Sequence, residues 1–295
     1  MPGLLSFSFC KETFFMRNPQ HWMIVGGLLL IGAPMAHAAT TDSGQLSLSA
    51  GADYSSGKYG TDTTTDIWSV PVTAAYQTER WTFKLTVPYI NISGAGNVIP
   101  GVGRVNNGNP IGRGLGHLIG GPGGSGGSTA TSSGSASGLG DITASAGYQL
   151  FASADRTAGL DLTGKVKFGT ADENKGLGTG KNDYGLALDT YKVSGAWTAF
   201  GGVGWMKYGS SQYIKLKNGF NANIGADYKL GPSDNIGAYY YYRERIADTG
   251  AAQSEIAGYW NHKFNDSLRV QAYALAGFAD GSPDYGVGAS LKYSF

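Results

Sequence analysis

The sequence predicts an all-β protein: a transmembrane, antiparallel, up-and-down β-barrel of about twelve strands with short periplasmic turns and longer external loops. Three observations lead to this class. An export signal stands near the amino terminus, segments with a period of two fill the remaining chain, and the last segment ends on an aromatic residue.

The composition fits a barrel wall. Glycine is abundant, at 48 residues, aromatic residues make up 12% and charged residues only 15%. Soluble globular proteins average roughly 25% charged residues, and disordered chains are poor in aromatics. The only cysteine, Cys10, lies in the export segment, so we expect no disulfide, thiolate metal site or lipid attachment. The formal net charge of +1 gives no reason to expect a nucleic-acid partner, and we predict no metal and no cofactor.

The export signal is predicted over residues 1–38. Met23 to Ala36 is apolar but broken by glycines, and it is too short for a spanning helix, which needs about 20 apolar residues. Ala36-His37-Ala38 follows as an A-x-A cleavage site. Because a basic n-region opens a signal, Met16 before Arg17 is the better translation start, and the mature barrel should cover residues 39–295.

Twelve segments show apolar residues at alternate positions, as strands with one lipid face require. They cover about 44–55, 65–77, 81–91, 139–151, 158–169, 183–191, 196–207, 219–230, 235–245, 253–264, 268–279 and 284–295. The segments at 183–191, 196–207 and 253–264 alternate less cleanly, so ten or fourteen strands stay open alternatives. Aromatic residues on the predicted outer face fall near the two ends of the strands, which is typical of membrane-interface girdles.

The connections alternate between long and short, which places both termini in the periplasm. The link over 280–283 is short where a long loop is expected. The longest connection, 92–138, is external and contains the Gly/Ser-rich run 120–128, which is typical of a flexible coil. It is interpreted either as a gate in the barrel mouth or as a mobile surface loop.

The last segment carries Leu291, Tyr293 and Phe295 at alternate positions. This ending resembles the carboxy-terminal signature of bacterial outer-membrane proteins, which implies recognition by the barrel-assembly machinery. The expected partners are therefore outer-membrane lipid, that machinery and a small-molecule solute whose identity the sequence leaves open.

Strand parity turns a set of charged and aromatic residues inward. The candidate pore-lining residues are Lys84, Asp141, Lys165, Lys167, Asp189, Asp227, Tyr239, Tyr241, Arg243 and Glu255. Both signs of charge are interspersed, whereas a strongly selective pore needs a cluster of one sign. An alternative is that these charges pair across the lumen and fix the shape of the barrel.

Little in the sequence indicates catalysis. The predicted mature chain holds only His117 and His262, which the strand order places far apart, so we predict no catalytic residues. A hydrolase that uses only carboxylates, with Asp141, Asp183 and Glu255 at the rim, stays an alternative.

Two motif blocks resemble a known family. The first is Gly138-Leu139-Gly140-Asp141-Ile142-Thr143, followed by Ala146-Gly147-Tyr148. The second comprises residues 164–170 and 176–184, including Lys167, Gly169, Thr170 and Asp183. These blocks are similar to motifs of the meta-pathway phenol-degradation family of outer-membrane β-barrel transporters. No binding residue is carried over beyond the motif positions, and the Gly/Ser-rich insertion departs from a typical loop.

The resemblance implies a transporter barrel, some members of which stand beside aromatic-degradation functions. The leading hypothesis is a passive channel or transporter in a Gram-negative outer membrane, with hydrophobic or aromatic compounds among its candidate solutes. The alternatives are a closed structural or adhesion barrel and a barrel hydrolase.

Overall fold

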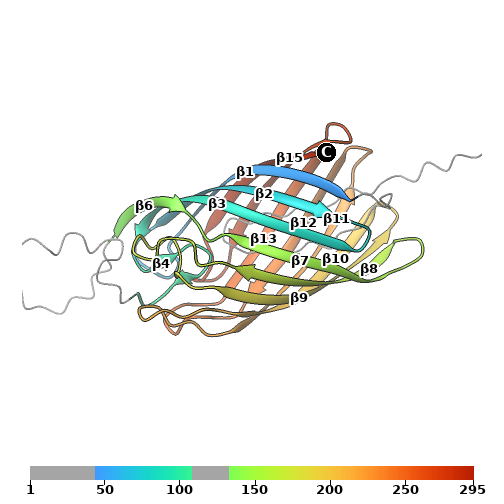
Figure 1. Cartoon of the computed structure of the whole chain (residues 1–295). Coiled ribbons are helices and arrows are strands. Elements are labelled where there is room, and N and C mark those ends of the chain that lie inside the picture. Colours follow the sequence, from blue (N-terminus) through green and yellow to red (C-terminus); the bar gives the residue numbers. More distant parts are fainter. Residues whose placement is uncertain (1–43, 108–132) are drawn as a thin grey trace, which may run out of the picture.

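The computed structural model describes residues 44–107 and 133–295, so the predicted export signal and its cleavage site at Ala36 and Ala38 lie outside it. The described residues form a closed antiparallel barrel of twelve strands, which confirms the predicted class and strand count (Figure 1). In these residues no helix is long and apolar enough to cross a membrane.

The wall strands follow one another around the barrel in chain order. They are β1 (Gln45–Gly57), β2 (Thr65–Gln77), β3 (Trp81–Ala95), β6 (Ser133–Leu139) with β7 (Thr143–Ala152), β8 (Ala158–Lys167), β9 (Asp183–Ser194), β10 (Trp197–Lys207), β11 (Gly219–Lys229), β12 (Asp234–Arg243), β13 (Gln253–Lys263), β14 (Leu268–Gly277) and β15 (Tyr285–Ser294). Two short strands, β4 (Val98–Ile99) and β5 (Gly103–Arg104), form a separate hairpin.

The barrel closes where the last strand meets the first. β15 pairs with β1 from Ser47–Ser294 to Ser56–Tyr285, and β1 pairs with β2 on its other edge. Closure satisfies the backbone N–H and C=O groups, which cannot stay unpaired in hydrocarbon. The Phe295 amide donates to the Leu46 carbonyl at 3.0 Å, so the described start of the chain and its carboxy end lie on the same side.

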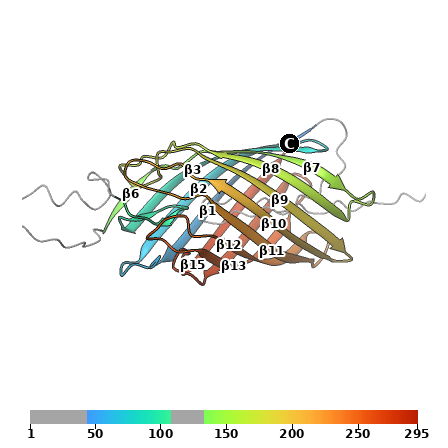
Figure 2. The same cartoon turned by 90° about the horizontal axis from the view of Figure 1, so that it is seen from below.

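Short turns and long loops occupy opposite ends of the barrel (Figures 1 and 2). The turns are 78–80, 153–157, 195–196, 230–233 and 264–267, and the loops 58–64, 168–182, 208–218, 244–252 and 278–284 are each longer. The prediction of a short link over 280–283 was wrong. Because β14 ends at Gly277, the loop covers 278–284 and is longer than each of the turns. The boundaries of the predicted loop 92–138 were also wrong, because β3 runs on to Ala95 and β6 begins at Ser133.

One turn shows how side chains set the tight connections. In 153–157, the Asp155 carboxylate accepts hydrogen bonds from the Ser153 hydroxyl at 2.6 Å and the Thr157 amide at 3.2 Å. These hydrogen bonds lower the pKa of Asp155 to about 2, and the bond from Ser153 makes the largest contribution. Arg156 has a φ of 53°, a left-handed conformation that tight turns use.

A proline explains why one wall strand is divided into β6 and β7. The prediction of one continuous strand over 139–151 was wrong, because the strand is interrupted at 140–142. Pro88 has no N–H, so the ladder from β3 stops at Thr86–Thr143 and resumes at Tyr89–Leu139. The Gly140 amide donates to the Pro88 carbonyl at 2.8 Å and bridges the gap.

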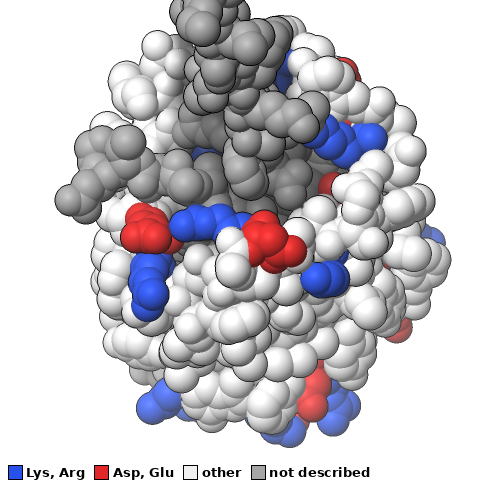
Figure 3. Space-filling view, turned by 90° about the vertical axis from the view of Figure 1, so that its right-hand side faces the viewer, with Lys and Arg blue, Asp and Glu red and all other residues white. Residues whose placement is uncertain are grey.

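The outer face is apolar and carries two aromatic bands. Near the loop ends Trp68, Tyr89, Tyr184, Phe220 and Tyr285 are exposed, and near the turn ends Tyr76, Trp81, Trp197, Tyr293 and Phe295 are exposed. Charged side chains of both signs lie around the turn end (Figure 3). A band of exposed apolar residues between two aromatic girdles is the surface that a bilayer covers, which places the barrel in the bacterial outer membrane.

Candidate functional site: the lumen and its mouth

The lumen has an aromatic wall. Inward side chains of β9, β10, β12, β13 and β14 form one cluster, comprising Tyr191, Phe200, Tyr239, Tyr241, Ala257, Tyr259 and Leu275, with Val193 and Tyr273 packed against it. Strand parity alone turns these residues inward, since their neighbours along each strand face the membrane.

Glycines hold several of these rings against the wall. Gly237 faces Tyr259 on the adjacent strand, and Gly288 faces Tyr273. A Cβ at either glycine would overlap the ring beside it. Each ring therefore occupies the space of a missing side chain on the next strand and lies against the barrel wall.

The opposite wall is polar and built from small residues. The register joins Ser49, Thr73 and Thr86 across β1, β2 and β3, and the hydroxyls of Thr73 and Thr86 are 2.8 Å apart. Basic residues flank this stretch: Lys84 and Lys165 both pair with Ser145, and Arg269 pairs with Lys292. Small hydroxyl residues occupy little volume, so this side adds little side-chain bulk to the lumen.

Carboxylates accompany the aromatic wall. Asp161 faces Asp189 on the adjacent strand, and Glu255 faces Tyr241. The Tyr273 hydroxyl donates to Asp53 at 2.7 Å. Acidic groups therefore lie beside several of the rings, while Lys165 shares β8 with Asp161 and Arg269 shares β14 with Tyr273.

Three residues of the two motifs, Asp141, Lys167 and Asp183, form a buried ion-pair cluster at the external end of the barrel, which we call the external lock. Lys167 lies 2.6 Å from Asp141 and 2.9 Å from Asp183, and all three side chains are buried. Asp141 also accepts the Ala171 amide at 2.9 Å, and Asp183 accepts the Gly209 amide at 2.8 Å. One lysine therefore neutralises part of a carboxylate pair that fastens two external loops to the rim.

Thr170 and Asn182 complete this lock. The Thr170 hydroxyl donates to the Gly140 carbonyl at 3.0 Å and accepts the Ile142 amide at 2.9 Å, on both sides of the strand break at Pro88. Asn182 accepts the Gly169 amide at 2.9 Å. The two sequence motifs thus serve as loop fasteners at the external rim.

A hairpin from β3 crosses the mouth. We call residues 96–107, which contain β4 and β5, the mouth hairpin. Its apolar side chains Ile99, Val102 and Val105 pack with Met206, Tyr208, Ile214 and Ile246 from β10 and the neighbouring loops. Since β12 lies opposite β3 in the strand order, the hairpin reaches the far side of the barrel.

Two arginines fasten the mouth hairpin. Arg243, which projects inward from β12, donates to the Gly101 carbonyl at 2.7 Å and the Val102 carbonyl at 2.8 Å. Arg104 on the hairpin donates to the Thr249 carbonyl at 2.8 Å and also to the Gly60 carbonyl. The mouth hairpin is therefore held from both sides and narrows the external entrance.

The structure divides the predicted pore-lining residues between three places. Lys84, Lys165, Asp189, Asp227, Tyr239, Tyr241 and Glu255 lie at inward positions of wall strands, Asp141 and Lys167 belong to the external lock, and Arg243 holds the mouth hairpin. Sequence analysis gave a gate in the barrel mouth as one interpretation of 92–138, but it did not predict the hairpin. It also did not single out the rings of Tyr191, Phe200, Tyr259 and Tyr273. The signal for the rings was available, because each occupies an inward position of a predicted strand.

His262 lies on the outer face near a turn, as its parity predicts. Its Nδ1 is 2.8 Å from Asp234, the Trp260 indole donates to the same carboxylate at 3.0 Å, and Phe264 packs edge-on against the imidazole. Within residues 44–107 and 133–295, no group of three or more His, Cys, Asp or Glu residues is arranged to hold a metal ion.

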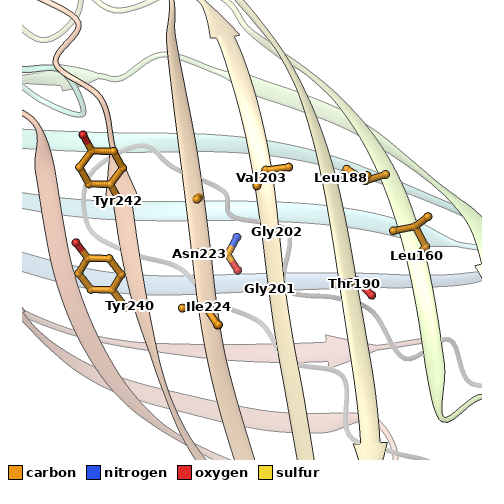
Figure 4. A pocket seen from close by; sticks show the side chains of 11 residues that line it. Leu160, Leu188, Thr190, Gly201, Gly202, Val203, Asn223, Ile224, Tyr240 and Tyr242 are labelled. Atoms are coloured by element: carbon orange, nitrogen blue, oxygen red, sulfur yellow. The ribbon is translucent and has the colours of Figure 1, made fainter.

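A groove of about 470 Å³ crosses the outer face of β8 to β12 (Figure 4). Gly201 and Ala222 lie along it, between Leu188, Val203, Ile224, Tyr240 and Tyr242. Val203 is 59% exposed and Ile224 67%, so this groove faces lipid and lies outside the lumen.

A closed barrel with a lipid band, a two-sided lumen and a hairpin at its mouth defines an outer-membrane β-barrel. The chain belongs to the family described as "Putative MetA-pathway of phenol degradation", whose model matches residues 60–295. This membership confirms the resemblance stated from the two motif blocks.

One solved structure agrees with the architecture. The chain is similar to the COG4313 outer membrane channel from Pseudomonas putida F1, with a TM-score of 0.62, 15% identity, and coverage of 89% of this chain and 99% of that one. Weaker likenesses include the KdgM porin (TM-score 0.46, 10% identity, 84% and 99% coverage) and the β domain of the Bordetella autotransporter BrkA (TM-score 0.47, 11% identity, 86% and 100% coverage). No curated protein matches the chain.

Proposed function

We propose that the chain is a passive outer-membrane channel for small molecules, with apolar and aromatic compounds among its solutes. The observation that carries this proposal is the fitting of aromatic rings into glycine positions on the next strand. Rings held in this way present their faces to a solute and leave the centre of the barrel to it. Aromatic faces stack with planar solutes at offset or edge-to-face geometries.

The barrel size is consistent with a path. An eight-stranded barrel is just filled by its own side chains, and the diameter grows with strand number. Twelve strands with serine, threonine and glycine on one side of the lumen therefore leave space that eight would not.

In this proposal the chain is not an enzyme. The support is the position of His262, which pairs with Asp234 on the lipid face, away from the carboxylates of the lumen. Outer-membrane lipid covers the apolar band, and the assembly machinery recognises the strand end at Leu291, Tyr293 and Phe295, which all face outward.

The alternative is a closed structural barrel, and the mouth hairpin is the observation that favours it. The two readings differ in what release of this hairpin should do. Arg243→Met removes the bonds to Gly101 and Val102 while keeping an unbranched side chain of comparable length. Loss of charge-assisted hydrogen bonds worth about 1.5–3 kcal/mol each should loosen the hairpin.

We expect the Arg243→Met protein to conduct at least about two-fold more than the unchanged protein in planar bilayers, because the entrance widens. Arg245→Met is the matched control, since Arg245 is exposed in the following loop. If the unchanged and Arg243→Met proteins are both electrically silent, the channel proposal fails and the closed barrel replaces it.

A further inference from the structure

One row of inward side chains beneath the mouth hairpin combines carboxylates with unpaired polar atoms. Reading across β9 to β13, the register places Asp189, Gly202, Asn223, Tyr241 and Glu255 side by side. Arg243, which holds the mouth hairpin, lies two residues beyond Tyr241 on the same face of β12. This row is therefore the first part of the aromatic wall that a solute meets below the entrance.

Two polar side-chain atoms of this row have no hydrogen-bond partner among the described residues. Asp189 and Asn223 both reach over Gly202, where a Cβ would overlap the carboxylate, and the Asn223 amide donates to Asp189. This bond uses the Asn223 nitrogen, and its buried Oδ1 has no partner among the described residues. The Tyr241 hydroxyl also has none within that part of the chain, although Tyr241 is only 2% exposed. Buried polar groups are normally satisfied, so such an arrangement needs an explanation.

Aromatic faces adjoin the row on its turn side. Tyr191 pairs with Phe200, and Tyr239 follows on β12, with Tyr259 at a ring-centroid distance of 6.4 Å. The faces of aromatic rings attract cations, and quaternary ammonium groups are bound between such faces. Carboxylates beside aromatic faces are therefore complementary to an organic cation that carries an ammonium head on an apolar body.

The basic residues of the lumen strengthen this preference. Lys84, Lys165, Arg269 and Lys292 lie on β3, β8, β14 and β15, outside the strands that carry the row, and Lys84 interacts electrostatically with Asp189. Arg243 is the cation closest to the row along its own strand, and its guanidinium donates to carbonyls of the mouth hairpin. The row therefore lies on strands β9 to β13, which carry none of these four basic residues.

We propose that Asp189, Asn223, Tyr241 and Glu255 form a binding track for organic ammonium cations, with Phe200 and Tyr239 receiving the apolar or aromatic body. We call these six residues the ammonium track. The inference rests on the proposed channel function and specifies a class of solute for it. An ammonium head passes between the Asp189 and Glu255 carboxylates, while the body slides on the ring faces.

A single salt tests the track. Benzyltrimethylammonium benzenesulfonate contains a cation and an anion that both carry one aromatic ring and a permanent charge. A gradient of this salt across a planar bilayer holding the purified protein gives the permeability ratio of the two ions from the reversal potential. We expect the cation to be favoured about five-fold or more.

The double variant Asp189→Asn, Glu255→Gln keeps the shapes and removes both charges, so the ratio should fall to about one. Glu79→Gln is the matched control, because Glu79 lies in the turn 78–80 and pairs with Arg156 on the surface. This control should leave the ratio unchanged.

A second measurement needs no variant. Benzyltrimethylammonium should block the KCl current of the unchanged protein at about five-fold lower concentration than tetramethylammonium, because only the former carries a ring. A permeability ratio near one, an unchanged ratio in the double variant or equal block by the two cations would overturn the ammonium track. In each case a KCl current would still support the channel, whereas the absence of any KCl current, even in Arg243→Met, would overturn the channel itself.

Discussion

At the scale of single residues, glycine decides how the lumen is lined. Gly237 gives its side-chain space to Tyr259, and the nearest ring atoms would overlap an added Cβ. Gly258 is an outward glycine on the neighbouring strand, and a Cβ there would meet only the Gly237 carbonyl oxygen at 3.9 Å. The two positions separate ring packing from the general cost of changing a glycine.

Gly237→Val should push the Tyr259 ring from the wall toward the lumen. We expect a loss of about 1–3 kcal/mol in the free energy of unfolding, as for other overpacked sites, together with a lower conductance. Gly258→Val should change neither quantity, because its side chain extends into lipid. Urea unfolding in lipid vesicles and bilayer recordings measure the two effects. Equal losses at both positions would show that the rings do not depend on the glycines.

At the scale of elements, the sequence predicts the strands well and their external connections poorly. The period of two follows from local geometry, so all twelve strands could be located, with β2 predicted over its observed residues. The division of the fourth wall strand into β6 and β7 could not be predicted. It arises because Pro88 on β3 lies opposite the gap between β6 and β7. The contacts that hold the mouth hairpin could not be predicted for the same reason, because Arg243 and Gly101 are 142 residues apart in the chain.

The external lock should depend on its buried lysine. Lys167→Met leaves Asp141 and Asp183 close together without a cation, and breaking a buried pair in this way costs about 3–5 kcal/mol. Loop 168–182 should then become sensitive to protease, and the free energy of unfolding should fall.

Lys217→Met supplies the comparison, since Lys217 pairs with Asp248 in exposed loops. Exposed pairs are weak, so this variant should keep the stability and protease resistance of the unchanged protein. Similar behaviour of Lys167→Met and Lys217→Met would contradict the role given to the lock.

At the scale of the whole molecule, two faces of one sheet carry two functions. The outer face is apolar between aromatic girdles, and the inner face carries its ring cluster on β9 to β14 and a row of small hydroxyl residues on β1 to β3. The outer face could be predicted in detail from parity. The inner face could be predicted only as a list of residues, because the gathering of Asp189 with Tyr241, or of Lys84 with Lys165, depends on the order and register of strands.

The central claim is that solutes and ions pass through the lumen, and two neighbouring residues test it most directly. Ser145 faces the lumen between Lys84 and Lys165, and Ala144 beside it faces lipid. Cys10 is the only natural cysteine and lies in the predicted export signal, so the protein refolded without that signal has no other thiol.

The measurement is the single-channel current before and after a charged methanethiosulfonate reagent is added to Ser145→Cys and Ala144→Cys proteins. We predict a stepwise drop in current for Ser145→Cys, because the reagent places bulk and charge in the path, and no change for Ala144→Cys. Current that is unaffected at Ser145, or reduced equally at both positions, would contradict a path through the lumen.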